Sequence, residues 1–398
     1  MRVLFVSPYI PSPVRVRPYQ WIRALARHGQ RVRLVALQPP EDRWVATPPV
    51  ADCCEQVTVF PLSRFRTLRN AAFAVPRDLP LQAAYSLHAE AERFIANESR
   101  HCDIVHVEHL RGSLLARRVR NTPCVIDAVD SISALFAQAA RQAPSWRQRL
   151  VARADLGRTR RFEAALPSRF ERSLVSSNRD AEALNELAAR ARSSRVVPLP
   201  NGVDLEYFHP VPSLPEPETV LFSGKISYHA NEAAALELAL RIMPIVWEQR
   251  PNARLVIAGK DPSQAIRLLS RDPRITVTGY VDDLRPFFWS ATLVVAPLVY
   301  GTGIQNKVLE AMACGVPVVA SRLACEGIGA ASGGAVLVGS ESREIAAHVI
   351  SLFRDPERRA ELASAGRRYV QSHHDWHQLG RQLIDVYEDV RTDYRRCA

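Results

Sequence analysis

Lysine is the scarcest charged residue in this chain. Of the 52 basic residues only Lys225, Lys260 and Lys307 are lysines, and all three lie in the second half. The seven cysteines are scattered and form no CxxC pair, which argues against a zinc or redox centre and for a reducing compartment. No apolar run reaches the roughly 18 residues of a membrane-spanning helix. Any contact with a membrane is therefore expected to be peripheral.

Other common signals are also missing. No GxGxxG follows the first expected strand, residues 2–7, which argues against a dinucleotide-binding site. No signal peptide precedes that strand. No block of basic residues with interleaved aromatics suggests a nucleic-acid partner. We therefore expect a cytoplasmic protein that binds no nucleic acid.

The length and composition indicate two globular domains. The chain has 398 residues, of which 47% are hydrophobic and 23% charged. Buried apolar runs of strand length alternate with helical patterns, which predicts an α/β fold with parallel sheets. The formal net charge of +11 suits an anionic partner, such as a phosphorylated substrate or an anionic membrane.

The most informative stretch runs from residue 291 to 327. Its pattern predicts a buried strand, a turn with Gly301 and Gly303, a helix over residues 305–314, and a second strand. A glycine turn that leads into a helix exposes backbone N–H groups at the positive end of the helix dipole, where a phosphate binds well. Lys307 lies in the first helical turn, where its charge opposes the dipole, and a bound anion would explain that position.

Glu310 follows three residues later, on the same helix face as Lys307. Its apolar neighbours predict a largely buried helix and a partly solvated carboxylate, which could accept hydrogen bonds from two vicinal hydroxyls of a ribose. An ordinary surface ion pair between Lys307 and Glu310 explains the same spacing equally well.

The motif GTGIQNKVLEAMACGVPVVAS with the later CEGI resembles the donor-binding signature of retaining glycosyltransferases of family four. Further segments agree in order and spacing, namely LPNGVDLEYFHP from Leu199, VLFSGKISYHAN from Val220, RLVIAGKDP from Arg254 and VTGYVDDLRPFF from Val277. The resemblance implies the GT-B architecture, in which two Rossmann-like domains face a central cleft. It implies an acceptor-side domain over 1–200, a nucleotide-sugar domain over 201–375, and a C-terminal helix over 376–398 that crosses back to the first domain.

The resemblance also implies roles for individual residues. Family members often have a diphosphate-binding basic residue at the position of Lys225, and the second basic position falls on Ala230, so we expect Lys307 to replace it. The usual first acid of the motif is Thr302 here, whose hydroxyl and backbone are expected to contact the donor sugar. The expected donor-binding residues are Gly224, Lys225, Tyr280, Val281, Gly301, Thr302, Gly303, Ile304, Lys307 and Glu310.

Polar residues in the first half follow two expected strands, at the carboxyl ends where α/β sheets bind ligands. In the family, the second histidine of an H-x-H motif lies beside the reacting sugar. That position is Glu108 here and His109 follows it, so both are candidate catalytic residues, with Lys225 and Glu310. A core or rim histidine is the simpler alternative. Acceptor-side candidates are Arg15, Arg17 and Asp127, although Arg15 and Arg17 could equally be solvated loop residues.

The implied function is transfer of a hexose-like sugar, with retention, from a nucleotide-diphosphate sugar to a saccharide or lipid-linked acceptor. Such a hexosyltransferase would serve cell-surface or exopolysaccharide synthesis. We expect no cofactor and no metal, because protein groups supply the positive charge at the diphosphate. A nucleotide-sugar epimerase on the same fold and a non-catalytic sugar-binding protein remain alternatives.

A segment with arginines among aromatic residues, SRFRTLRNAAFAVPRDLP, begins at Ser63. Phe65, Leu68 and Phe73 fall at helical spacing, so the segment could lie on the anionic inner face of the cell membrane. A helix packed on its own domain is the alternative and explains the pattern more simply.

Overall fold

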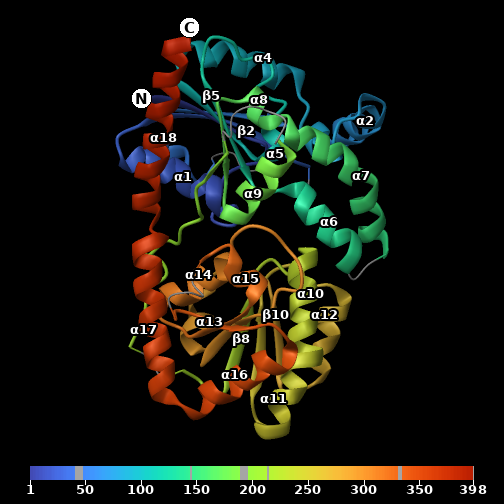
Figure 1. Ribbon diagram of the computed structural model, residues 1–398, viewed down its shortest axis with the longest axis vertical. Helices are drawn as coiled ribbons and strands as arrows, with labels where there is room; N and C mark the ends of the chain where they lie inside the picture. The colour runs from blue at the N-terminus through green and yellow to red at the C-terminus, as the bar shows by residue number, and fades with distance from the viewer. Residues whose placement is uncertain (41–47, 144–145, 189–195, 213–214, 330–333, 398) are drawn as a thin grey trace. The chain divides into compact units, whose positions relative to one another are not determined.

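The computed structural model describes residues 1–40, 48–143, 146–188, 196–212, 215–329 and 334–397. These residues form two compact domains (Figure 1). The first contains residues 1–137, 152–200 and 376–398, and the second contains 138–151 and 201–375. Ala398, the last residue of the expected C-terminal helix, lies outside the described residues.

The first domain is built on a parallel seven-stranded sheet, in the order β3-β2-β1-β4-β5-β6-β7. The central strands are buried along almost their whole length, as expected for a sheet covered on both faces. The strands are β1 (Arg2–Ser7), β2 (Arg31–Gln38), β3 (Gln56–Pro61), β4 (Ile104–Glu108), β5 (Cys124–Val129), β6 (Arg172–Val175) and β7 (Val196–Pro198).

Two apolar clusters cover the faces of this sheet. On one face, α1 packs against the C-terminal helix α18, where Trp21 and Trp376 meet edge to face at 4.8 Å. A Cβ at Gly380 would lie 2.7 Å from the Ala24 Cβ, so only glycine permits this close approach. The helices are α1 (Val16–Arg27), α2 (Arg64–Ala74), α3 (Leu81–Tyr85), α4 (Ala89–Glu98), α5 (His109–Gly112), α6 (Ile132–Gln142), α7 (Trp146–Ala164), α8 (Leu166–Arg169), α9 (Asn178–Leu187) and α18 (Trp376–Cys397). The end of α6 and the start of α7 fall within residues 138–151, which belong to the second domain.

The second domain has a parallel six-stranded sheet, in the order β10-β9-β8-β11-β12-β13. The central strand β8 and its neighbour β11 are fully buried. The strands are β8 (Thr219–Ser223), β9 (Arg254–Ala258), β10 (Ile275–Gly279), β11 (Leu293–Ala296), β12 (Val318–Ser321) and β13 (Leu337–Gly339). The helices are α10 (His229–Glu237), α11 (Met243–Gln249), α12 (Gln264–Leu268), α13 (Arg285–Ser290), α14 (Asn306–Ala313), α15 (Arg322–Glu326), α16 (Ser342–Arg354) and α17 (Pro356–His373).

The α/β class with two parallel sheets is confirmed. One local expectation was wrong. The sequence allowed Arg17 to be a solvated loop residue, but α1 begins at Val16 and includes it. Pro18 falls in the first turn of α1, where the backbone N–H that proline lacks would have no helical partner. Among the described helices, none is both long and apolar enough to cross a bilayer.

Candidate functional site

The turn after β8 places a lysine at the carboxyl edge of the second sheet. The buried strand ends at Ser223, and Gly224 follows with a φ of 139°. A Cβ at Gly224 would lie 3.2 Å from Nδ2 of Asn231 and 3.4 Å from Cε of Lys307, so glycine permits a tight approach here. Lys225 comes next and is exposed.

The start of α14 lies after β11, at the same edge of the sheet. Gly301 and Gly303 have φ values of 154° and 70°, which favour glycine. The Gln305 side chain makes no capping hydrogen bond, and the first turn has no acidic residue. The positive end of the helix dipole therefore has no anionic side chain of its own. A Cβ at Gly327, in the CEGI segment, would lie 2.6 Å from the Gly303 carbonyl oxygen, so that glycine lets the two segments touch.

Lys307 is buried, with only 6% of its surface exposed. Its Nζ donates a hydrogen bond to Oδ1 of Asn231 at 2.6 Å and lies 4.2 Å from the centre of the Phe222 ring. Burial lowers the pKa of Lys307 to about 7, against the opposite effect of the charge on Glu310. The amide and the aromatic ring that contact the ammonium are both neutral, so neither compensates the positive charge of its protonated form.

Glu310 is half-buried, one helical turn after Lys307. Burial raises the pKa of Glu310 to about 7, while the charge on Lys307 acts in the opposite direction. Within the described part of the chain, the two residues make no ion pair with each other, and Lys307 bonds to Asn231 instead. The surface ion pair that the spacing also allowed is therefore not what forms.

The other donor-site candidates lie on loops of the second domain. The hydroxyl of Thr302 is buried and has no hydrogen-bond partner among the described residues. Tyr280 follows Gly279 at the end of β10 and is 66% exposed, whereas Val281 is half-buried. Ile304 is buried just before α14. The exposed Tyr280 ring and the unpaired Thr302 hydroxyl both have capacity left for a ligand.

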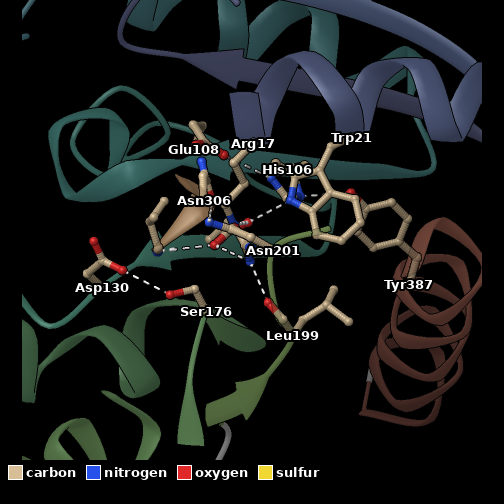
Figure 2. Close-up of polar contacts among 12 residues, drawn as sticks. Arg17, Trp21, His106, Glu108, Asp130, Ser176, Leu199, Asn201, Asn306 and Tyr387 are labelled. Atoms are coloured by element: carbon tan, nitrogen blue, oxygen red, sulfur yellow. Dashed lines mark hydrogen bonds and ion pairs between the residues drawn. The ribbon is translucent and has the colours of Figure 1, made fainter. Parts of the chain in front are cut away.

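In the first domain, His106 and Glu108 lie at the carboxyl end of β4, and both are fully buried. The His106 ring stacks on Phe5 at 4.4 Å, and its Nδ1 lies 2.7 Å from the Tyr387 hydroxyl of α18 (Figure 2). Tyr9 donates a hydrogen bond to Oε1 of Glu108 at 3.3 Å. Nε2 of His106 and Oε2 of Glu108 are 3.7 Å apart, and each lacks a hydrogen bond among the described residues.

Burial and nearby charges decide the protonation of this pair. Burial lowers the pKa of His106 to about 4, so the ring is neutral. Burial and the charge on Asp127 raise the pKa of Glu108 well above its ordinary value, so this carboxyl tends to stay protonated. A neutral acid in this position can donate or accept a proton, but its side chain has no access to solvent.

Arg17 and Asp127 form a buried ion pair. Nε of Arg17 lies 2.7 Å from Oδ2 of Asp127, and Trp21 donates to the same oxygen at 3.0 Å. Arg17 also donates to the backbone oxygen of Leu199 at 2.9 Å (Figure 2). Burial alone would raise the pKa of Asp127, but Arg17, with further help from His106 and the hydrogen bonds, lowers it. We refer to Arg17, His106, Glu108 and Asp127 as the His106 cluster.

This ion pair changes the interpretation of two acceptor-side candidates. Only 5% of Arg17 and 0% of Asp127 are exposed, so both charges are satisfied inside the domain. Arg17 is therefore not a solvated loop residue, and the carboxylate of Asp127 is not open to an acceptor. Arg15, the third candidate, is half-buried, and its guanidinium lies 4.4 Å from the centre of the Tyr9 ring.

His109 begins the short helix α5 and is half-buried. Its φ of 62° is unusual for a residue with a Cβ, and such strain often marks functional positions. Its Nδ1 accepts a hydrogen bond from the Arg111 backbone at 3.1 Å, and burial lowers the pKa of His109 to about 3. Nδ1 is thus an acceptor, which makes Nε2 the N–H donor of the neutral ring.

A metal ion would find three ligand atoms close together in the His106 cluster. Those of His106, Glu108 and Asp127 lie within 4.8 Å of one another. However, both oxygens of Asp127 accept hydrogen bonds from Arg17, whose positive charge would repel a cation. These residues fit a buried polar network better than a metal centre.

Sequence reasoning missed the residues that connect these side chains. Asn231 contacts both lysine-bearing segments, and Tyr387 reaches His106 from 281 positions away. Tyr9, which is 99 positions from Glu108, donates a hydrogen bond to it. Asn231 is the last residue of the segment VLFSGKISYHAN. Its position shortly after the β8 turn was the feature of the sequence that could have identified it as a site residue. For Tyr387, the expected C-terminal helix gave no indication of a polar partner.

The comparisons with known proteins agree with this architecture. Residues 217–355 match the family model described as Glycosyl transferases group 1. A phosphatidyl-myo-inositol mannosyltransferase of Mycobacterium leprae is 24% identical over 98% of this chain and 98% of its own. A protein of that name from Mycolicibacterium smegmatis is 30% identical, but this match spans 52% of this chain and 56% of the relative.

Solved structures of similar fold cover almost the whole chain. A sucrose-phosphate synthase from Thermosynechococcus elongatus has a TM-score of 0.73 with 18% identity, over 99% of this chain and 100% of its own. The Anabaena protein Alr3699/HepE, in complex with UDP and glucose, has a TM-score of 0.69 with 14% identity, over 98% and 99%. Residues 217–355, which form most of the second domain, are thus similar to the glycosyl transferases group 1 family, and the two parallel sheets with these structural neighbours show the GT-B fold.

Proposed function

We propose that this chain is a retaining hexosyltransferase that moves a sugar from a nucleotide-diphosphate donor to a saccharide or lipid-linked acceptor. One observation carries the proposal, namely the buried ammonium of Lys307 in the first turn of α14, beside an amide and an aromatic ring. Burying such a charge costs free energy, which a bound anion at the positive helix end would offset.

The donor is held by groups at one edge of the second sheet. Its diphosphate meets the start of α14 at Gly303 and Ile304, together with Lys225 and Lys307. These groups stabilise the negative charge that develops on the leaving diphosphate, so the proposal includes no metal. Glu310 accepts hydrogen bonds from the ribose hydroxyls.

The donor base and sugar have further candidate contacts on the same loops. The exposed Tyr280 and the adjacent Val281 contact the base in this proposal. The unpaired hydroxyl of Thr302 contacts the sugar in place of the family's usual carboxylate. A neutral hydroxyl can donate as well as accept, so it suits a sugar oxygen in either role.

His109 is the first-domain residue that we propose to contact the reacting sugar. It is half-buried and has a strained backbone, whereas Glu108 is fully buried and bonded to Tyr9. Glu108 then does not contact the sugar and instead belongs to the polar network that fixes the end of β4, next to His109. Because the imidazole is neutral, it would donate a hydrogen bond through Nε2.

A binding screen tests this function. UDP-, GDP- and ADP-sugars are titrated against the full chain by calorimetry, and one class is expected to bind with micromolar affinity. Lys225→Ala should weaken that binding about tenfold, because it removes a charge-assisted contact. Transfer to an acceptor, with no new sugar isomer formed from donor alone, separates a transferase from an epimerase. Absence of binding by every donor class would refute the proposal.

We also propose peripheral contact with an anionic membrane through α2, which suits a role in cell-surface or exopolysaccharide synthesis. In α2 a polar residue, Asn70, faces inward and donates to the Tyr85 and Leu87 carbonyls. Phe65 and Leu68 are 77% and 71% exposed. Exposed arginines surround them, namely Arg64, Arg69 and Arg77. Apolar side chains among cations suit the interface of an anionic bilayer.

Vesicle co-sedimentation tests the membrane contact. Phe65→Ser with Leu68→Ser should reduce binding to vesicles rich in an anionic phospholipid about tenfold. Leu240→Ser is the matched control, because Leu240 is 60% exposed in the second domain. Equal binding by both variants would rule out α2 as the contact.

A further inference from the structure

Asn231 bridges the two segments that carry Lys225 and Lys307. It lies in the first turn of α10, and its backbone N–H donates to the Tyr228 carbonyl at 2.8 Å. Its Oδ1 accepts from Nζ of Lys307 at 2.6 Å, and its Nδ2 donates to the Lys225 backbone oxygen at 2.9 Å. The two ends of one amide thus bind the start of α14 and the turn after β8.

The packing around this amide leaves Lys307 little freedom. The ammonium has the Phe222 ring on one side, 4.2 Å away, and Asn231 on another. The missing side chain of Gly224 makes room for both, because a Cβ there would lie 3.2 Å from Nδ2 of Asn231 and 3.4 Å from Cε of Lys307. The lysine chain, which normally loses much rotamer entropy on binding, is therefore already ordered.

The chemistry of an amide suits this position. A lysine ammonium has three donors, and one is used by Asn231. A carboxylate in the same place would also orient the ammonium, but it would neutralise the charge that an anion needs. The amide fixes the geometry and leaves the charge intact, which is what electrostatic preorganisation requires.

We propose that Asn231 is a positioning residue, which holds the Lys307 ammonium and the Gly224–Lys225 turn at a fixed separation so that both meet one diphosphate. This inference rests on the proposed function, since it presupposes a nucleotide-diphosphate ligand. Asn231 acts through Lys307 and the turn, and its own contacts are with those groups.

The test compares ligands that differ only in their phosphates. Affinities for the preferred nucleoside diphosphate and for the corresponding free nucleoside are measured by calorimetry for the full chain. Asn231→Ala should weaken diphosphate binding about tenfold, because the ammonium and the turn lose their common partner, and leave nucleoside binding unchanged. Asn252→Ala is the control, because Asn252 is an exposed asparagine of the same domain. Thermal unfolding confirms that each variant folds.

A second variant, Asn231→Asp, separates positioning from simple packing. The charged group that acts on Lys307 is Glu310 on its own helix, whereas β8 and α10 face it with the Phe222 ring and the Asn231 amide. In the wild type, diphosphate binding should weaken as pH rises through 7 and Lys307 loses its proton. A carboxylate at 231 would hold that proton, so the decline should move to higher pH while affinity at pH 6 falls.

The outcomes separate the two proposals. If the wild type binds a nucleoside diphosphate and Asn231→Ala binds it equally well, the positioning role is overturned and the proposed function stands. If Asn231→Ala weakens diphosphate and nucleoside equally, the residue supports the fold alone and the positioning role is again overturned. If the wild type binds no nucleoside diphosphate, the proposed function and this inference both fail.

Discussion

The two domains each bury charged groups at the carboxyl ends of parallel strands, but they satisfy those charges differently. In the His106 cluster, the Arg17 guanidinium meets the Asp127 carboxylate at 2.7 Å. In the second domain, the Lys307 ammonium meets a neutral amide, and Glu310 makes no ion pair among the described residues. Removing one member of a buried ion pair destabilises the domain, because the other charge is left buried without a partner. A buried charge without a counter-ion can instead gain free energy from a bound ligand of opposite charge.

Arg17→Ala should give the largest effect, because it leaves the Asp127 carboxylate buried without its cation. We expect the free energy of unfolding to fall by about 3–5 kcal/mol, measured by chemical denaturation of the full chain. Arg15→Ala, which removes an arginine over the Tyr9 ring, should cost about 1 kcal/mol or less. Similar losses for the two variants would contradict the contrast between the domains.

Lys307→Met tests the other half of the contrast. Nucleoside diphosphate affinity should fall about 100-fold, since a buried charge that contacts phosphate is lost, whereas thermal stability should be unchanged or raised. Arg271→Met removes an exposed charge before β10 and should affect neither property. A destabilised Lys307→Met protein would mean that the ammonium is structural, like Arg17.

Tyr387→Phe should have a smaller effect on the first domain. The change leaves Nδ1 of His106 without its partner in a fully buried site, at a cost of about 1–3 kcal/mol in the free energy of unfolding. Tyr394→Phe, on the same helix and only half-buried, is the matched control, expected within about 0.5 kcal/mol of the wild type. If Tyr387→Phe matched this control, the His106 cluster would not depend on α18.

The pH dependence of stability should show the smallest effect. Glu310 has a raised pKa of about 7, so it binds more protons folded than unfolded, and its contribution to stability falls as pH rises from about 4.5 to 7. Lys307 has a lowered pKa of about 7, so stability is regained as pH rises from about 7 to 10.5. The pair therefore favours a stability minimum near pH 7.

Thermal unfolding across pH, without ligand, measures this minimum. Other buried acids also titrate, so the melting temperature of the wild type is compared at each pH with that of the double variant Glu310→Gln/Lys307→Met. The stability of the wild type relative to the variant should be lowest near pH 7 and rise on either side. A difference that does not vary with pH would argue against the shifted pKa values of both groups.

Local patterns in the sequence predicted much of the fold. The buried strand expected within residues 291–327, before the glycine turn, is β11, Leu293–Ala296, and the helix expected over 305–314 is α14, Asn306–Ala313. Gly301 and Gly303 adopt the positive φ values that the expected turn requires. Such features depend on residues near each other in the chain, so the amino-acid order reveals them directly.

Boundaries and charge partners were harder to predict. Arg17 was a possible loop residue, yet α1 includes it, because a proline such as Pro18 is tolerated in the first helical turn. The pattern identified Asp127 as a strand-end carboxylate, but its partner Arg17 lies 110 residues earlier. A residue type can indicate that a charge exists, but it does not say which other charge the fold brings to it.

The sequence by itself determined the alternation of buried strands and helices, the glycine turn before α14, and the unusual place of a lysine in its first turn. Only the tertiary structure decided that Asp127 has a guanidinium beside it and that Lys307 has an amide from 76 residues away. The physical reason is that strand order, which depends on packing across the whole sheet, selects the side chains that meet at its edge.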